Sequence, residues 1–150
     1  MVWMLSLGIL LNATKEERTV LKTLITNGRI QDEFILFLLE SLTKEKIEGE
    51  RNKTTYKPFK NLLKNTDCVN IKENDVKKYL ASWYKNTKLL TWHNYRASIG
   101  DSYYYYGYWS FEAAAVVATL DLDDSRFRDN EYYPKDLVDF YRTQKGKGMQ

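Results

Sequence analysis

Apolar residues recur at helical spacing along most of the chain. The segment Thr14-Lys15-Glu16-Glu17 fits a capping box, in which the Thr14 side chain accepts from the backbone amide of Glu17 and Glu17 reaches back. The apolar residues that follow fall on one face of a helix: Val20, Leu21, Leu24 and Ile25. Asn27-Gly28 is typical of a helix end. The pattern therefore predicts a helix between these two signals.

Two further segments are apolar on almost every side. Phe34 to Leu39 is an unbroken apolar run that would suit a strand, but Asp32 as a cap and acidic residues on both flanks favour a helix to about Thr43. Met1 to Leu11 carries no charge. It has about half the ~20 residues that span a bilayer, and it lacks the basic start and cleavage pattern of a signal peptide. We expect it to be buried in the domain's own core or against a second copy.

The rest of the chain alternates charged connections with helical segments. Thr43 to Lys57 is highly charged and contains Gly49, so we expect a solvated loop. Helices are predicted at about 59–64, 72–86, 110–120 and 134–141, the third rich in alanine and the last with Pro134 in its first turn. These elements predict a mainly α, single-domain protein over 1–143, either a helical bundle or an array of short helices with irregular, aromatic-rich connections. Residues 144–150 are expected to form a flexible tail.

One cysteine and one histidine limit the available chemistry. Cys68 excludes a disulfide within the chain and favours a reducing compartment, so we expect a cytoplasmic protein. Structural zinc needs several Cys or His ligands, whereas Cys68 and His93 supply one of each. The sequence has no phosphate-binding loop and no nucleophile motif. We therefore expect no catalytic residues, no cofactor and no metal site.

Charge is distributed unevenly along the chain. Residues 111–140 hold eight acidic and three basic residues, a net charge of −5, whereas the whole chain carries +3, which leaves +8 elsewhere. Three of the other basic residues fall in a Gly-containing stretch that we expect to be frayed: Arg142, Lys145 and Lys147. The acidic segment is thus a candidate surface for a basic partner.

Asp121-Leu-Asp-Asp124, within this acidic segment, invites comparison with an EF-hand loop. Such a loop needs alternating acids, a central glycine and a terminal glutamate about twelve residues from the first acid. This segment has no glycine, and position twelve is Tyr132. A solvated acidic turn is the better interpretation.

Aromatic residues are concentrated in Tyr103-Tyr-Tyr-Tyr106 and in Tyr108-Trp109. Such rings pack in a core, contact a partner protein or stack on nucleic-acid bases. No basic residue lies between Asp101 and Arg126, which disfavours nucleic acid. We expect most of these rings to pack beneath the alanine-rich helix and some to form a protein interface.

Glu112 is the polar exception on the helix predicted at 110–120. Its neighbours are apolar or aromatic, so we expect it to be buried and hydrogen-bonded by Tyr hydroxyls, a Trp indole or an Arg. No second acid stands at a matching position, which favours a structural network over acid–base catalysis. A small hydrolase built on Glu112 and His93 is the least favoured interpretation.

The strings Tyr106-Gly-Tyr-Trp-Ser-Phe-Glu-Ala-Ala-Ala115, Leu122-Asp-Asp-Ser125 and Arg128-Asp-Asn-Glu-Tyr-Tyr-Pro-Lys-Asp-Leu137 resemble a known family. They are similar to the C-terminal domain of the PoNi-type immunity proteins. The resemblance is strongest over 103–140, extends to Trp83-Tyr84 and Trp92-His93-Asn94, and is weak over 5–11. The positions that carry the motifs, with an expected structural role, are Gly107, Tyr108, Trp109, Phe111, Glu112, Tyr133 and Pro134.

The resemblance implies a helical, non-catalytic protein that is encoded beside a polymorphic toxin and protects the producing cell by binding that toxin. DNases delivered between bacteria are among the toxins of this kind. Many members, as the resemblance implies, carry a further helical domain ahead of these motifs. Inhibitors of nucleases are often acidic overall, and this chain departs from that pattern because its net charge is +3.

We therefore expect an immunity protein that neutralises a cognate toxin, a nuclease, by stoichiometric occlusion. A nuclease holds phosphates with basic residues, and an acidic surface would fit that groove. The candidate toxin-binding residues are Asp121, Asp123, Asp124, Asp129, Tyr104 and Tyr105.

The alternative function is a nucleic-acid-binding helical module. It would use the basic remainder of the chain through its Lys-rich helices: Lys57, Lys60, Lys64, Lys72, Lys77, Lys78, Lys85 and Lys88. A cognate protein toxin is the favoured partner, and neither a membrane nor nucleic acid is expected. A monomer and a homodimer both remain open.

Overall fold

The computed structural model describes residues 1–60, 62–63, 66–88, 90, 93 and 108–147 of the chain. Within these residues the chain forms seven α-helices and one 3₁₀ turn, and its β structure is a single isolated bridge. The elements are α1 (Val2–Leu10), α2 (Lys15–Asn27), α3 (Glu33–Thr43), α4 (Lys57–Lys60), η1 (Cys68–Asn70), α5 (Glu73–Asn86), α7 (Phe111–Leu120) and α8 (Lys135–Lys147). The prediction of a mainly α fold is confirmed.

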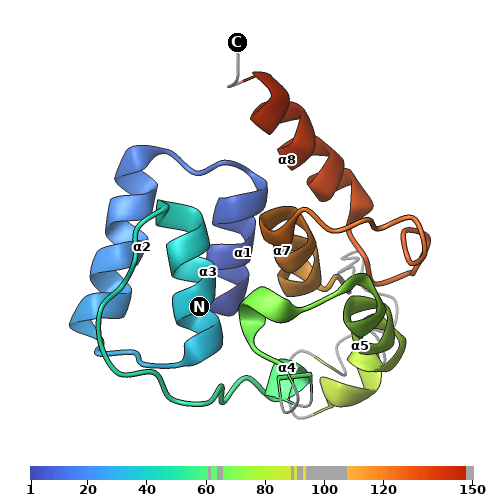
Figure 1. The fold of residues 1–150 in the computed structure, drawn as a ribbon, viewed down its shortest axis with the longest axis horizontal. Helices are drawn as coiled ribbons and strands as arrows, with labels where there is room; N and C mark the ends of the chain where they lie inside the picture. The colour runs from blue at the N-terminus through green and yellow to red at the C-terminus, as the bar shows by residue number, and fades with distance from the viewer. Residues whose placement is uncertain (61, 64–65, 89, 91–92, 94–107, 148–150) are drawn as a thin grey trace, which may run out of the picture.

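The uncharged first helix lies at the centre of the molecule. Figure 1 shows α1 between α3 and α7, with α2 on the far side of α3, and α1 packs against all three and against α8. Its buried residues are Val2, Leu5, Ser6, Ile9 and Leu10. The buried Ser6 hydroxyl donates to the Val2 carbonyl at 2.9 Å. Burial within the domain's own core therefore accounts for the apolar composition of this helix.

Small residues let the central helices approach one another closely. Ala113, Ala114, Ala115 and Ala118 of α7 are all buried, on the helix that packs most extensively against α1. On α1, a Cβ at Gly8 would stand 3.3 Å from the Leu42 side chain of α3. Because interiors are close-packed, a larger side chain at Gly8 would push α3 outward.

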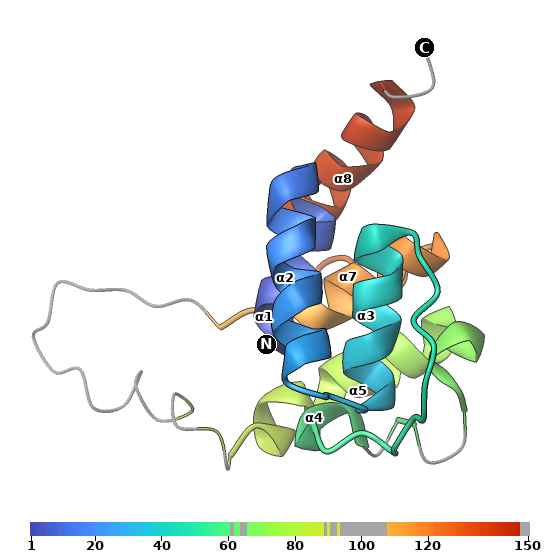
Figure 2. The same cartoon turned by 90° about the vertical axis from the view of Figure 1, so that its left-hand side faces the viewer.

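The predicted capping residues Thr14 and Asp32 make their capping hydrogen bonds at the starts of α2 and α3. The Glu17 amide donates to the Thr14 hydroxyl at 3.3 Å, and the Thr14 amide donates to the Glu17 carboxylate at 2.7 Å. Asp32 accepts from the amides of Phe34 at 3.0 Å and Ile35 at 3.2 Å. The apolar run after Asp32 is therefore a helix and not a strand, and α2 and α3 run side by side in Figure 2.

The charged connection between α3 and α4 is a largely exposed loop, as expected, but one part of it is fixed to the start of α3. Its Asn52 forms a parallel bridge with Asp32, and Thr54 is buried. The Asp32 carboxylate, besides capping α3, accepts from the Thr55 amide at 2.7 Å. Charged residues thus cover the outer side of this connection, while polar contacts fasten its backbone to the start of α3.

The last helix is longer than predicted. It continues to Lys147 instead of ending near Tyr141, and it rises past the turn between α1 and α2 (Figure 2). Arg142 is therefore part of a helix and not of a frayed tail, and so is Lys145. Contacts of α8 with α7 and α1 support its added turn. By contrast, α4 is shorter than predicted and spans Lys57–Lys60.

None of the helices in the described part of the chain is long and apolar enough to cross a lipid bilayer.

Candidate functional site

The connection between α7 and α8, residues 121–134, holds the predicted acidic site. α7 ends at Leu120, and the left-handed backbone of the next residue, Asp121 (φ 53°), turns the chain away from the helix. Beyond it Leu122, Phe127 and Tyr133 are buried, and Phe127 lies edge-on to Tyr133 with 5.3 Å between ring centroids. The connection is therefore anchored to the core at several points.

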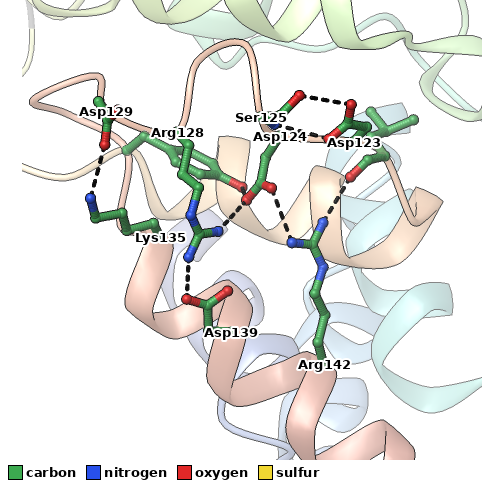
Figure 3. Close-up of polar contacts among 10 residues, drawn as sticks. Asp123, Asp124, Ser125, Arg128, Asp129, Lys135, Asp139 and Arg142 are labelled. Carbon is green, nitrogen blue, oxygen red and sulfur yellow. Dashed lines mark hydrogen bonds and ion pairs between the residues drawn. The ribbon is translucent and has the colours of Figure 1, made fainter.

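Asp124 is the polar centre of this connection (Figure 3). One of its oxygens accepts from Arg128 Nη1 and from the Tyr133 hydroxyl, each at 3.0 Å, and the other accepts from Arg142 Nη1 at 3.1 Å. Burial would destabilise a lone carboxylate, and these three donors compensate for the lost water. Since Arg142 comes from α8, Asp124 joins the connection to the last helix.

The neighbours of Asp124 stabilise its charged form. Burial alone would raise the pKa of this carboxyl group, but hydrogen bonds from Arg142 and Tyr133 and the charges of Arg142 and Arg128 bring it below its usual 3.8. Burial, and then the charge of Asp124, raise the pKa of the Tyr133 hydroxyl, which therefore keeps its proton and donates it. At neutral pH the cluster is an anion held between two cations.

Both arginines make a second contact that holds the connection against α8. Arg128 Nη2 pairs with Asp139 of α8, and Arg142 Nη2 donates to the Leu122 carbonyl at 2.8 Å (Figure 3). Each guanidinium thus bridges two acceptors, for which its planar fork is well suited. The side chains that this connection exposes consequently have a fixed support.

Asp121 and Asp129 lie on the exposed side of the connection, as predicted. Asp129 pairs with Lys135 at 3.0 Å, and Asp121 pairs with Lys145 at 3.6 Å. Each of these four side chains is at least 44% exposed. Exposed pairs of this kind contribute little and exchange readily with other partners.

The four predicted acids therefore do not act alike. Asp123 is exposed, and it accepts from the Ser125 amide at 3.0 Å and the Ser125 hydroxyl at 2.8 Å. The expectation that Asp124 is presented at the surface beside the other three is wrong, because its residue is only 5% exposed. Hydrogen bonds from two arginines and a tyrosine compensate for its burial, and the buried carboxylate in turn fixes the position of the exposed acids.

The aromatic candidates are described in part. Tyr104, Tyr105 and Gly107 lie outside the described residues. Tyr108 is half-buried and donates its hydroxyl to the His93 carbonyl at 3.1 Å, whereas Trp109 is 42% exposed. Trp109 is therefore a ring of this cluster that a partner can reach.

Glu112 is buried and hydrogen-bonded, which confirms the prediction for this residue. Its Oε1 accepts from the Tyr79 hydroxyl and Trp83 Nε1, each at 2.6 Å, and from the Ser110 hydroxyl at 3.0 Å. Burial, and then the charge of Glu112, raise the pKa of the Tyr79 and Tyr56 hydroxyls. The carboxylate thus joins α5 to α7 as a structural acceptor.

Three other motif positions make structural contacts elsewhere in the fold. Phe111 meets Trp3 of α1 edge-on, with 5.6 Å between ring centroids. Tyr133 belongs to the Asp124 cluster, and Pro134 directly precedes α8, where its carbonyl accepts from the Leu137 amide at 3.1 Å.

The lone histidine and cysteine are packed side chains. His93 Nδ1 lies 2.9 Å from the Thr87 hydroxyl, and its ring stacks on Tyr84 at 4.2 Å. Burial, and then the charge of Glu33, raise the pKa of the Cys68 thiol to about 12, so the thiol stays protonated at neutral pH. Across the described residues, no three acidic, histidine or cysteine side chains form a group that could hold a metal ion.

A family model for the C-terminal part of the PoNe immunity proteins (PoNi) matches residues 30–137. This range runs from the start of α3 into the first turn of α8 and includes both the Glu112 network and the acidic connection. The chain belongs to this family. The family is named for immunity proteins, and the match is to the C-terminal part of those proteins.

A solved structure shares the fold of almost the whole chain, including residues ahead of the PoNi match. The chain is similar to the crystal structure of protein PA2201 from Pseudomonas aeruginosa, with a TM-score of 0.64 and 19% sequence identity. The similarity covers 96% of this chain, and so includes helices ahead of the PoNi match, but only 50% of that chain. The chain thus spans about half the length of this relative. No curated protein sequence matches it.

Arg128 and Arg142 are site residues that the sequence analysis of this PoNi chain missed. Asp124 and Arg128 are four residues apart, a spacing that suggests an ion pair and could have been used. Arg142 is 18 residues from Asp124 and was assigned to a frayed stretch, so local spacing carried no signal for that pair.

Proposed function

We propose that this chain neutralises a nuclease toxin by covering the groove with which the toxin holds DNA. Membership of the PoNe immunity family supports the protective role. The nuclease target and the occlusion mechanism rest on one observation of the structure: the exposed acids of the α7–α8 connection stand on a support that an internal ion cluster keeps in place.

The charge of this surface suits a nuclease. A protein that binds DNA must neutralise phosphates with lysine and arginine. Asp121, Asp123 and Asp129 would meet such residues in place of the phosphates, and their long-range field would speed association. The ion pairs that Asp121 and Asp129 form within the chain are exposed, so replacing them by pairs with lysine or arginine of the toxin costs little free energy.

A preformed acidic surface also limits the entropic cost of binding. The Asp124 cluster already orders the backbone on which the exposed acids stand. Less conformational freedom is then lost in the complex than with a free loop. Trp109 supplies exposed aromatic area at the start of α7, and Tyr104 and Tyr105 are proposed as further anchors.

In this account the chain acts in the cytoplasm of the producing cell, with one copy covering one toxin. Protection by binding needs no catalytic step. The competing function, a nucleic-acid-binding module, would use the exposed lysines of α5, which include Lys77, Lys78 and Lys85.

Displacement of DNA from the toxin separates these two functions. The toxin encoded next to this protein, with its catalytic residue inactivated, would be saturated with a fluorescent duplex and titrated with the chain. We expect the duplex to be released in full near one equivalent, and the chain alone to leave its anisotropy unchanged at 0.15 M salt. Duplex bound by the chain itself, with a steep loss of affinity as salt rises, would favour the nucleic-acid module and contradict the proposal.

A further inference from the structure

Three cationic side chains from distant parts of the chain meet at a second surface feature, next to the acidic connection. Arg18 comes from α2, Lys44 is the residue that ends α3, and Lys145 comes from α8. They line a pocket of about 290 Å³. Asn12, Tyr141 and Gln144 line the same pocket and can donate neutral hydrogen bonds.

The positive charge of this pocket is incompletely compensated. α1 and α3 end beside it, and each helix end carries about half a negative charge, so together they offset about one of three cations. Asp121 pairs with Lys145 at 3.6 Å, and both side chains are more than half exposed. Even with that pair counted in full, the pocket keeps a net charge of about +1.

The positive charges of the three side chains also repel one another. Partial burial, followed by the charges of Arg18 and Lys145, lowers the pKa of the Lys44 ammonium. Arg18 uses Nε on the Ala13 carbonyl at 2.7 Å and Nη2 on the Asn12 side chain at 2.8 Å, so its guanidinium is held in place. An anion between these groups would relieve the repulsion among their charges.

We propose that this pocket receives the carboxylate of a single aspartate or glutamate side chain of the toxin. The inference rests on the proposed function, because a partner that covers the acidic connection also covers the adjoining pocket. The Asp121–Lys145 pair joins the two features, and α8 runs along both.

The neighbouring acids decide the class of anion. Asp121 and Asp123 would repel a nucleic-acid backbone, whose phosphates follow one another at short intervals. One carboxylate on an otherwise basic protein surface meets no such repulsion. The binding surface would then have two parts. The acidic area would bind lysine and arginine side chains of the toxin, and the basic pocket would bind one carboxylate of the toxin. Two contacts of opposite charge fix the orientation of the complex.

The free chain tests the pocket without the toxin. With ¹³C at the lysine Cε positions, the chain would be titrated with N-acetylaspartate N-methylamide, whose single carboxylate is that of the side chain, at constant ionic strength, and separately with inorganic phosphate. We expect saturating shifts at Lys44 and Lys145 with the aspartate amide, and none at Lys46, an exposed lysine on the same loop. Saturation with phosphate but not with the aspartate amide, or with neither, would overturn the proposal.

Toxin binding tests the assignment of the carboxylate to the partner. Lys44→Gln and Lys44→Gly should both weaken the Kd for the toxin at least about tenfold, while Lys46→Gln should leave it unchanged. Lys44 has a left-handed backbone (φ 62°), which glycine adopts without strain, so a loss in Lys44→Gly does not come from unfolding.

The outcomes separate this inference from the proposed function. If the toxin binds all variants equally, the pocket plays no part in the complex and the inference fails, while the immunity function stands. If the toxin does not bind the wild-type chain, the proposed function fails, and so does the assignment of the carboxylate to the toxin. The titration of the free chain then still decides whether the pocket binds a carboxylate.

Discussion

Glu112 places a carboxylate in the middle of a helix whose other buried residues are apolar. Its acceptor oxygen holds the Tyr79 hydroxyl and the Trp83 indole from α5. Glu112→Ala should lower the free energy of unfolding by about 1–3 kcal/mol, because it strands the buried Tyr79 hydroxyl. Urea denaturation measures the loss, and Glu48→Ala, at an exposed acid, serves as the control. A Glu112→Ala variant as stable as the control would show that the network contributes nothing.

Asp124 should make stability depend on pH in the acidic range. Its pKa is lower in the folded chain than the usual 3.8, so its contribution to stability is fully present above 3.8 and disappears as pH falls through the lower, folded value. Asp124→Asn should therefore cost about 2 kcal/mol at pH 7 and progressively less below pH 3.8. Unfolding curves of both proteins at pH 7, 4 and 3 give the comparison. An equal cost at all three values would mean that the Asp124 charge is not stabilised by its arginines.

The exposed acids should act mainly on the rate of association. With Asp121, Asp123 and Asp129 all changed to Asn, we expect the toxin association rate constant to fall about tenfold at low salt and the deficit to shrink at high salt. Stopped-flow fluorescence measures both rate constants. A triple variant with Gln at Glu16, Glu48 and Glu50, three exposed acids of other elements, carries the same charge change and should associate like the wild type. If both variants slow association equally, net charge and not this surface is responsible.

Single residues differ in how well the sequence predicts whether they are buried or exposed. The burial of Glu112 followed from its apolar neighbours along one helix, and the structure agrees. Asp124 stands among polar residues, so its sequence context suggested solvent. Its burial depends on Arg142, which α8 brings back from 18 residues away. Local spacing could suggest the pair of Asp124 with Arg128, but it carries no signal for the pair with Arg142.

At the scale of elements, α1 is central to the core, because it packs against α2, α3, α7 and α8. Leu5 is completely buried and its neighbour Met4 is 50% exposed, which provides a matched pair on one helix. Leu5→Ala should destabilise the chain by about 2–5 kcal/mol through the cavity that it leaves, whereas Met4→Ala should change stability by less than about 0.5 kcal/mol. Thermal denaturation of the two variants tests this. Equal effects would mean that α1 is not packed in the domain as described.

The ends of α2, α3, α5 and α7 were predicted from the sequence, and the end of α8 was not. Thr14 and Asp32 are capping residues, and their side chains form the hydrogen bonds that the sequence suggests. The end of α8 was placed too early, because Gly146 and the basic residues near it read as a tail. Contacts of Arg142 and Lys145 with the α7–α8 connection hold the additional turn, and such contacts exist only in the folded molecule.

At the scale of the whole molecule, two charged areas adjoin each other along α8, the acidic α7–α8 connection and the basic pocket. The sequence could show the acidic segment, since its charges are contiguous. The basic pocket could not be found in this way, because Arg18, Lys44 and Lys145 are separated by 26 and 101 residues. Folding alone brings them together, and in the proposed complex the two areas together would orient the toxin.

Titration of toxin nuclease activity with this chain tests the central claim most directly. With the toxin at a concentration well above Kd, we predict that DNA cleavage falls linearly and reaches zero at one equivalent of the chain, independent of the amount of substrate DNA. Activity that persists with the chain in excess would contradict the account. So would inhibition that appears only when the chain outnumbers the DNA, because the chain would then be protecting the substrate rather than occluding the toxin.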